Sequence, residues 1–167
     1  MGRVVFWSCF ASVFLSMFSA TILANITLLP VVPDLVLLVV LYVSFMNNAV
    51  VGSTTGFISG ILFDFLSAAP VGLNAFTKTV VGYITGKMSG MYNLDRVFIP
   101  FIMAVGATVL KMLTTGFLSF LFDETVVVFT PASSVFWLEV VFNGLCAPLV
   151  FSLLGLFPSL FLIKGNR

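Results

Sequence analysis

Five ionisable side chains interrupt the otherwise apolar stretches of this 167-residue chain: Asp34, Asp64, Lys78, Lys111 and Glu139. A charge in lipid hydrocarbon costs at least about 2.5–3.5 kcal/mol on insertion scales, so each group needs a charged partner or a route to water. The chemistry open to them is ion pairing, the lining of a polar pocket that opens to the outside, or docking against the membrane helix of another protein.

Asp64 and Lys78 are spaced for an ion pair across a turn. Asp64 lies near the end of one apolar segment, Pro70 and Gly72 mark a turn, and Lys78 lies about six residues into the next segment. At 1.5 Å per residue this lysine is about 9 Å deep, and its stem can extend outward toward the carboxylate. We expect an Asp64–Lys78 ion pair at the end of a hairpin, either as a structural pin or as a site for a partner or ligand.

Lys111 lies near the middle of its apolar segment, too deep to reach water easily. A buried lysine without a partner tends to lose its proton. A carboxylate from Asp34, Asp64 or Glu139 would keep the Lys111 ammonium charged, so we expect at least one of these acids beside it.

The composition indicates that the protein folds in a lipid membrane, and it excludes several kinds of catalytic and metal site. The residues are 60% hydrophobic and 8% charged, whereas about a quarter of the residues in soluble domains are charged. The chain has no histidine, which excludes a His base or His metal ligand, and no glycine-rich phosphate loop is present. The seven Lys and Arg residues are scattered rather than clustered. We therefore expect a membrane protein that is not an enzyme, with no cofactor, no metal and no nucleic-acid partner.

Apolar segments separated by Pro, Gly and polar clusters predict an all-α integral membrane protein of one domain, residues 1–167, with six transmembrane helices. The second and third segments are short, so a re-entrant pair is an alternative there. The predicted spans are 4–29, 35–46, 49–66, 73–91, 97–122 and 135–163.

The distribution of charge predicts the orientation of these spans. Cytoplasmic loops are enriched in Lys and Arg. With both termini in the cytoplasm, five basic residues fall on the inner side and none on the outer side, where Asp34, Asp64 and the pair Asp123–Glu124 would lie. The five inner basic residues are Arg3, Lys87, Arg96, Lys164 and Arg167.

Glycines recur every four residues on two consecutive predicted spans. Four-residue steps keep residues near one face of a helix, and small residues allow membrane helices to approach closely. We expect two facing stripes in a tightly packed hairpin. The helix-packing glycines are Gly52, Gly56 and Gly60 on one span and Gly82, Gly86 and Gly90 on the next.

Several of these residues fall into ordered motifs that resemble the rod shape-determining membrane protein MreD family. The motifs are "PDL" at 33–35, "GFISGILFD" at 56–64, Pro70 with Gly72, "GY" at 82–83, and "FNGLCAPLVF" at 142–151. Lys78 and Lys111 have no place in the family pattern, so the roles considered for them rest on the residues alone.

The resemblance implies a non-enzymatic, multi-pass component of the cell-elongation machinery in the bacterial inner membrane, which directs peptidoglycan synthesis. It implies a bundle similar to the substrate-binding subunits of energy-coupling-factor transporters. MreC is the implied partner, with RodA, a class B penicillin-binding protein and MreB as indirect partners besides membrane lipid. The alternative is a transporter-type subunit that binds a vitamin or another small molecule. A homodimer is left open by the sequence.

Overall fold

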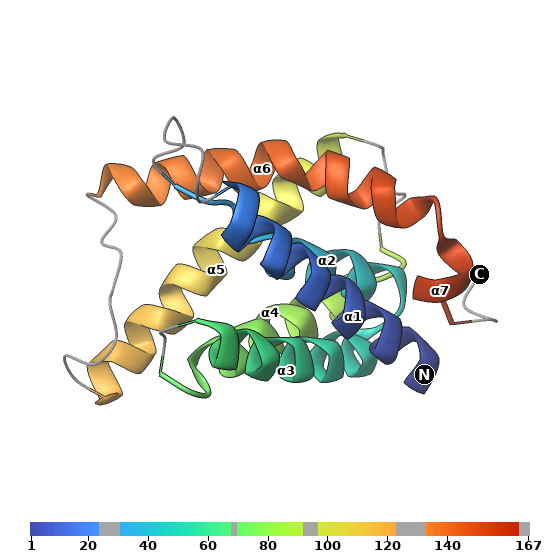
Figure 1. Cartoon of the computed structure of the whole chain (residues 1–167), viewed down its shortest axis with the longest axis horizontal. Helices are drawn as coiled ribbons and strands as arrows, with labels where there is room; N and C mark the ends of the chain where they lie inside the picture. The colour runs from blue at the N-terminus through green and yellow to red at the C-terminus, as the bar shows by residue number, and fades with distance from the viewer. Residues whose placement is uncertain (24–30, 68–69, 92–96, 123–132, 164–167) are drawn as a thin grey trace.

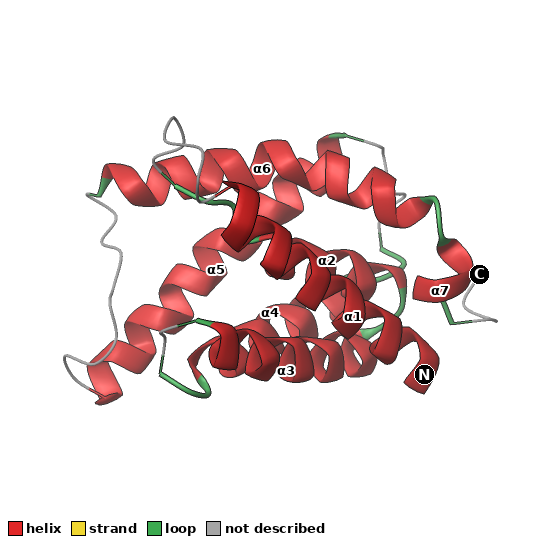
Figure 2. Ribbon diagram, viewed as in Figure 1, coloured by secondary structure: helices red, strands yellow, loops and turns green. Residues whose placement is uncertain are grey.

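The computed structural model describes residues 1–23, 31–67, 70–91, 97–122 and 133–163, and the regular structure in these ranges is entirely helical (Figure 2). Within these ranges, seven α-helices and one π-helical turn follow one another. They are α1 (Gly2–Phe18), η1 (Ser19–Leu23), α2 (Leu35–Met46), α3 (Ala49–Leu66), α4 (Leu73–Lys87), α5 (Phe98–Phe122), α6 (Ser134–Gly155) and α7 (Pro158–Phe161).

Three predicted spans differ from the helices that form. For the span 4–29, α1 begins at Gly2 and ends at Phe18, η1 continues to Leu23, and residues 24–29 lie outside the described residues. Helix α4 ends at Lys87, and Gly90 lies beyond it with φ +78°, in the left-handed region that favours glycine. The expectation that Gly90 packs on a helix is therefore wrong. The predicted span 135–163 is divided into α6 and α7, because a residue before proline avoids the α conformation and Phe157 precedes Pro158 with φ −119° and ψ 54°.

Helix α2 is the centre of the bundle. It contacts α1, α3, α4, α5 and α6, and every residue from Leu35 to Phe45 is buried. A helix that is apolar all round belongs in such a position. Its 12 residues span only about 18 Å at 1.5 Å per residue, so its ends lie inside the layer that the longer helices define.

Helices α3 and α4 form an antiparallel hairpin, and they lie side by side in Figure 1. The α-carbon of Gly56 faces the backbone of Lys78, and Gly52 and Gly82 face each other's carbonyl groups. A methyl group at any of these glycines would overlap the backbone of the opposite helix. The same contact joins Gly60 to Ala75 and Gly86 to Ala49. The glycines thus bring the two backbones together.

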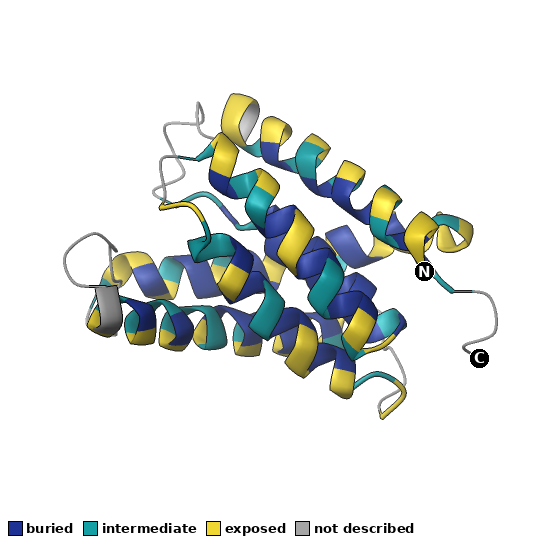
Figure 3. Cartoon of the chain, turned by 90° about the horizontal axis from the view of Figure 1, so that it is seen from below, coloured by how far each residue is buried: buried dark blue, intermediate teal, exposed yellow. Residues whose placement is uncertain are grey.

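The outer surface of the bundle is apolar. Phe6, Phe10 and Phe14 of α1 are each more than half exposed, as are Leu145 and Leu149 of α6, and exposed positions lie along the outward sides of the helices (Figure 3). Within the described residues, four helical segments are long and apolar enough to cross a membrane: Gly2–Thr21, Ala49–Leu66, Phe98–Phe120 and Ser134–Gly155. The chain is an all-α membrane protein.

One end of the bundle joins the start of α1, the α2–α3 turn and α7 (Figure 1). Arg3 donates a hydrogen bond of 2.6 Å to the Ser159 carbonyl. The side-chain amide of Asn47 donates to the Phe161 carbonyl (2.8 Å) and accepts from the Ile163 N–H (2.8 Å). Ser89, just after α4, donates to the Asn47 carbonyl. The charged residues of interest lie toward the other end.

Candidate functional site

Asp34 is the residue on which the buried charges converge. It is the N-cap of α2, and its Oδ1 accepts from the Leu37 N–H at 3.0 Å. A cap of this kind satisfies one of the backbone donors that a helix start leaves free. The other oxygen, Oδ2, lies 3.2 Å from Nζ of Lys78 and 3.0 Å from Nζ of Lys111. One carboxylate therefore holds α2 to both α4 and α5.

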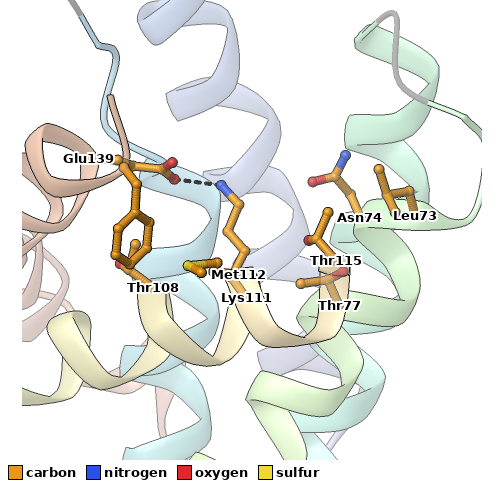
Figure 4. A pocket seen from close by; sticks show the side chains of 9 residues that line it. Leu73, Asn74, Thr77, Thr108, Lys111, Met112, Thr115 and Glu139 are labelled. Atoms are coloured by element: carbon orange, nitrogen blue, oxygen red, sulfur yellow. Dashed lines mark hydrogen bonds and ion pairs between the residues drawn. The ribbon is translucent and has the colours of Figure 1, made fainter. Parts of the chain in front are cut away.

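Lys111 also joins α5 to α6. Its Nζ lies 2.6 Å from Oε1 of Glu139 in addition to its contact with Asp34, and Figure 4 shows the lysine extended toward Glu139. Two of the three acids considered as partners for Lys111 are thus beside it. Asp64 is not among the ion-pair partners of Lys111 within the part of the chain that the structure describes.

Lys78 is 1% exposed and has three partners. Besides Asp34, its ammonium donates to Oδ1 of Asn74 at 2.9 Å and lies 4.7 Å from the centre of the Phe63 ring. An ammonium over an aromatic face is attracted by the ring's electron density. Carboxylate, amide and ring together replace the water that a lysine loses on burial.

Asp64 caps α4 instead of pairing with Lys78. Its carboxylate accepts hydrogen bonds from the N–H groups of Gly72 (2.9 Å), Asn74 (3.0 Å) and Ala75 (3.2 Å). These donors surround the start of α4, where unpaired N–H groups and the helix dipole favour negative charge. The expected Asp64–Lys78 ion pair is wrong, since none of the ion pairs among the described residues joins them.

Asn74 connects the two residues that were expected to touch. Its Nδ2 donates to Oδ1 of Asp64 at 2.9 Å, while its Oδ1 accepts from Nζ of Lys78 at 2.9 Å. Gly72, with φ +101°, allows the chain to turn so that its own N–H also reaches Asp64. The motif from Pro70 to Asn74 therefore shapes the binding of the Asp64 carboxylate.

Asn143, which belongs to the motif at 142–151, is a second polar residue that the predicted site did not include. Its Oδ1 accepts from the backbone N–H of Asp34 at 2.8 Å, and its Nδ2 donates to Thr108 Oγ1 at 3.0 Å. Thr108 in turn donates to the Ala104 carbonyl. A fully buried asparagine in an apolar helix needs such partners, and the presence of an amide inside the predicted apolar span 135–163, in the motif at 142–151, is the signal that could have indicated it.

A cavity of about 120 Å³ lies beside this network, between α4, α5 and α6 (Figure 4). Its polar lining comes from Asn74, three threonines, Lys111 and Glu139, and its apolar lining from Leu73, Met112 and Phe136. The threonines are Thr77, Thr108 and Thr115. Polar and charged groups from three helices thus meet at one small, partly open space within the bundle.

The charges of this arrangement are mutually paired or hydrogen-bonded. Two ammonium groups, Lys78 and Lys111, face two carboxylates, Asp34 and Glu139, and the Asp64 carboxylate accepts from backbone and amide N–H groups. Its contacts join α2, α3, α4, α5 and α6. We call Asp34, Lys78, Lys111 and Glu139 the charge cluster.

An all-helical chain with an apolar outer surface and buried, mutually paired charges is a multi-pass membrane protein. A sequence model of the rod shape-determining protein MreD matches residues 1–157. The chain belongs to the MreD family, and this membership assigns it a role in rod shape determination. Comparisons with curated proteins and with solved structures found no match.

Proposed function

We propose that this protein is a non-enzymatic scaffold of the cell-elongation machinery in the bacterial inner membrane, and that it binds MreC. The family match across residues 1–157 carries the proposal. RodA, a class B penicillin-binding protein and MreB are proposed as indirect partners, through which the scaffold would act on peptidoglycan synthesis.

The proposal includes six membrane crossings. Helices α1 to α6 alternate in direction, since Arg3, Asn47 and Ser89 meet the α7 end while Asp34, Asp64 and Glu139 lie toward the other. Helices α2 and α4 are shorter than the four long segments, at 12 and 15 residues. An isolated helix of that length would be too short to cross the ~30 Å hydrocarbon layer. Because α2 and α4 are packed among the longer helices, their ends need not reach the surfaces of the layer, and this supports counting them as crossings.

The end that carries Arg3 and Lys87 is proposed to be cytoplasmic. Both lie at the end defined by Asn47, because Arg3 meets Ser159 and Ser89 follows α4 closely. Arg96, Lys164, Arg167, Asp123 and Glu124 lie outside the described residues. The positive-inside rule then places Asp34, Asp64 and Glu139 in the outer half.

Within this scaffold the charge cluster is proposed to hold the outer halves of the helices in one arrangement. Asp34, Lys78 and Glu139 are at most 8% exposed, so they are poorly placed to touch a partner directly. A buried ion pair specifies which helices meet more than it stabilises the fold. The outer surface offered to MreC would then depend on the cluster indirectly.

The small size of the polar cavity favours the scaffold over the transporter-type alternative, because the larger groove of about 740 Å³ between α1 and α3 is lined mainly by apolar residues. Sites for vitamins and similar ligands usually have volumes of about 300–1,000 Å³, whereas the space beside Lys111 has about 120 Å³. A vitamin-sized molecule would have to separate α4 from α5 and break the Lys111 contacts.

Co-purification tests the proposal. Tagged protein extracted from membranes in a mild detergent should retain MreC, and Glu139→Gln, which leaves Asp34 on Lys111, should retain more MreC than Asp34→Asn. Each variant is compared at equal amounts of folded, monodisperse protein. Absence of MreC from the wild-type eluate, together with a small molecule detected by native mass spectrometry, would overturn the scaffold in favour of the transporter-type subunit.

A further inference from the structure

The cavity beside Lys111 contains polar groups whose hydrogen bonding the protein leaves incomplete. Thr77 is 3% exposed and lines the cavity, yet its hydroxyl has no hydrogen-bond partner among the described residues. Threonines in helices commonly donate to the carbonyl four residues earlier, as Thr79 and Thr108 do here. A buried hydroxyl without a partner is unfavourable, so its presence at the cavity points to a ligand.

Lys111 supplies a second incomplete group. An ammonium has three N–H donors, and Asp34 and Glu139 account for two of them. The side chain is 24% exposed although it lies inside the bundle, and Lys111 is a lining residue of the cavity (Figure 4). The third N–H donor of Lys111 therefore faces the cavity.

The charges around the cavity define the ligand as neutral. Lys78 and Lys111 balance Asp34 and Glu139. An anion at the remaining donor of Lys111 would be repelled by the Asp34 and Glu139 carboxylates already bound there, and a cation would be repelled by the lysine that lines the wall. A neutral group that both donates and accepts hydrogen bonds suits a wall of hydroxyl, ammonium and carboxylate groups.

The size of the cavity selects water. A buried water needs a cavity volume of at least about 10–15 Å³ and two to four polar partners. The cavity beside Lys111 has a volume of about 120 Å³. We propose that the space between α4, α5 and α6 is an internal hydration site, in which a few water molecules bond to the Thr77 hydroxyl and the Lys111 ammonium.

The depth of this site makes hydration a distinctive property. Lys111 lies 11 positions before the end of α5 at Phe122, about 16 Å along the helix at 1.5 Å per residue. A position on the outside of α5 at the same depth faces the apolar surroundings, as Leu113 does with 62% exposure. The two sides of one helix turn should therefore differ sharply in their contact with water.

Cysteine reactivity measures this difference. In full-length protein with Cys9→Ala and Cys146→Ala, reconstituted in lipid nanodiscs, Thr115→Cys places a thiol on the cavity wall and Leu113→Cys places one on the outer surface. Because the thiolate is the reactive form and needs water, iodoacetamide should modify Thr115→Cys at least tenfold faster. Equal rates at the two positions, or a faster rate at Leu113→Cys, would overturn the hydration site.

Thermal unfolding of threonine variants gives a second measurement. Thr77→Val should lower Tm if water bonds to the hydroxyl, and Thr77→Ser should keep most of the wild-type Tm. Thr55 is the matched control. It is fully buried and its hydroxyl also has no partner in the part of the chain that the structure describes, but it does not line this cavity. Thr55→Val should leave Tm unchanged or raise it. A Thr77→Val variant that behaves like Thr55→Val would show that the cavity is dry.

Neither cysteine reactivity nor Tm involves MreC. The proposals of a hydration site and of a scaffold can therefore fail independently of each other.

Discussion

Nζ of Lys78 lies 3.2 Å from Oδ2 of Asp34, a residue 44 positions earlier in the chain. The contact joins the start of the central helix α2 to the buried face of α4. Lys111, 77 positions after Asp34, reaches the same oxygen from α5. The position of one carboxylate thus sets how three helices meet, and this dependence can be measured.

Replacing Asp34 should destabilise the protein more than replacing any other acid of the charge cluster. Asp34→Asn keeps an oxygen for the α2 cap but leaves Lys78 without a carboxylate. Breaking a buried ion pair by removing one partner costs about 3–5 kcal/mol. Glu139→Gln is the matched variant, because Lys111 then retains Asp34. The Tm in detergent, measured as the fraction of protein that stays monodisperse after heating, should fall more for Asp34→Asn than for Glu139→Gln. Equal decreases in Tm would contradict the central position of Asp34.

A double-mutant cycle should separate the contact of Lys78 with Asp34 from its relation to Asp64. Contacting residues show interaction free energies of about 0.5–3 kcal/mol. We expect a value in this range for Asp34→Asn combined with Lys78→Met. The combination of Asp64→Asn with Lys78→Met should give a smaller value, because Asn74 lies between these residues. A larger interaction free energy for Asp64 with Lys78 than for Asp34 with Lys78 would show that Asp64 and Lys78 pair directly.

The glycines between α3 and α4 should not accept a methyl group. A Cβ at Gly56 or Gly82 would overlap the backbone of the opposite helix, and backbone cannot move aside as a flexible side chain can. Gly56→Ala and Gly82→Ala should therefore lower Tm markedly. Gly106, also helical, has nothing within 4 Å of an added Cβ, so Gly106→Ala should keep or raise Tm, since alanine is favoured over glycine in helices by about 0.5–1 kcal/mol. A loss at Gly106→Ala as large as that at Gly56→Ala would show that the close approach is not the cause.

Asn143 should be important to the start of α2. Asn143→Leu removes the acceptor of the Asp34 N–H and the donor to Thr108, and an unpaired buried N–H costs about 1–3 kcal/mol. Thr108→Val leaves the bond to Asp34 in place and removes only the second contact. Unfolding in detergent should therefore begin at a lower temperature for Asn143→Leu than for Thr108→Val. Equal Tm values would indicate that the bond to Asp34 contributes little.

Local sequence features account for much of the helical layout. Asp34 and Asn48 cap α2 and α3, and both helices occupy the ranges that the sequence predicted, 35–46 and 49–66. Two helix boundaries are among those that differ from the predicted ones. One lies before Gly90, which has a left-handed backbone conformation, and the other lies at Pro158, which begins α7 although it stands within a longer apolar segment.

The side chains of the site were predictable as a set, but their partners only in part: Asp34 and Glu139 were expected for Lys111, whereas the expected partner of Lys78 was wrong. Burial in an apolar segment shows from sequence alone that Asp34, Lys78 and Lys111 each need a partner. The hairpin spacing suggested Asp64 for Lys78, because those two are neighbours along the chain. In the folded protein the backbone donors at the start of α4 already bind Asp64.

The sequence by itself determined that this is an all-α membrane protein of the MreD family whose buried charges must be satisfied, because composition, motif order and four-residue spacing are properties of the chain. Only the tertiary structure decided that Asp34, rather than Asp64, receives both lysines and that Asn74 and Asn143 complete the network. The reason is physical: spacing places a residue on the face of its own helix, whereas an ion pair depends on how the helices pack against one another. The short central α2 brings Asp34 to the depth of Lys78 and Lys111.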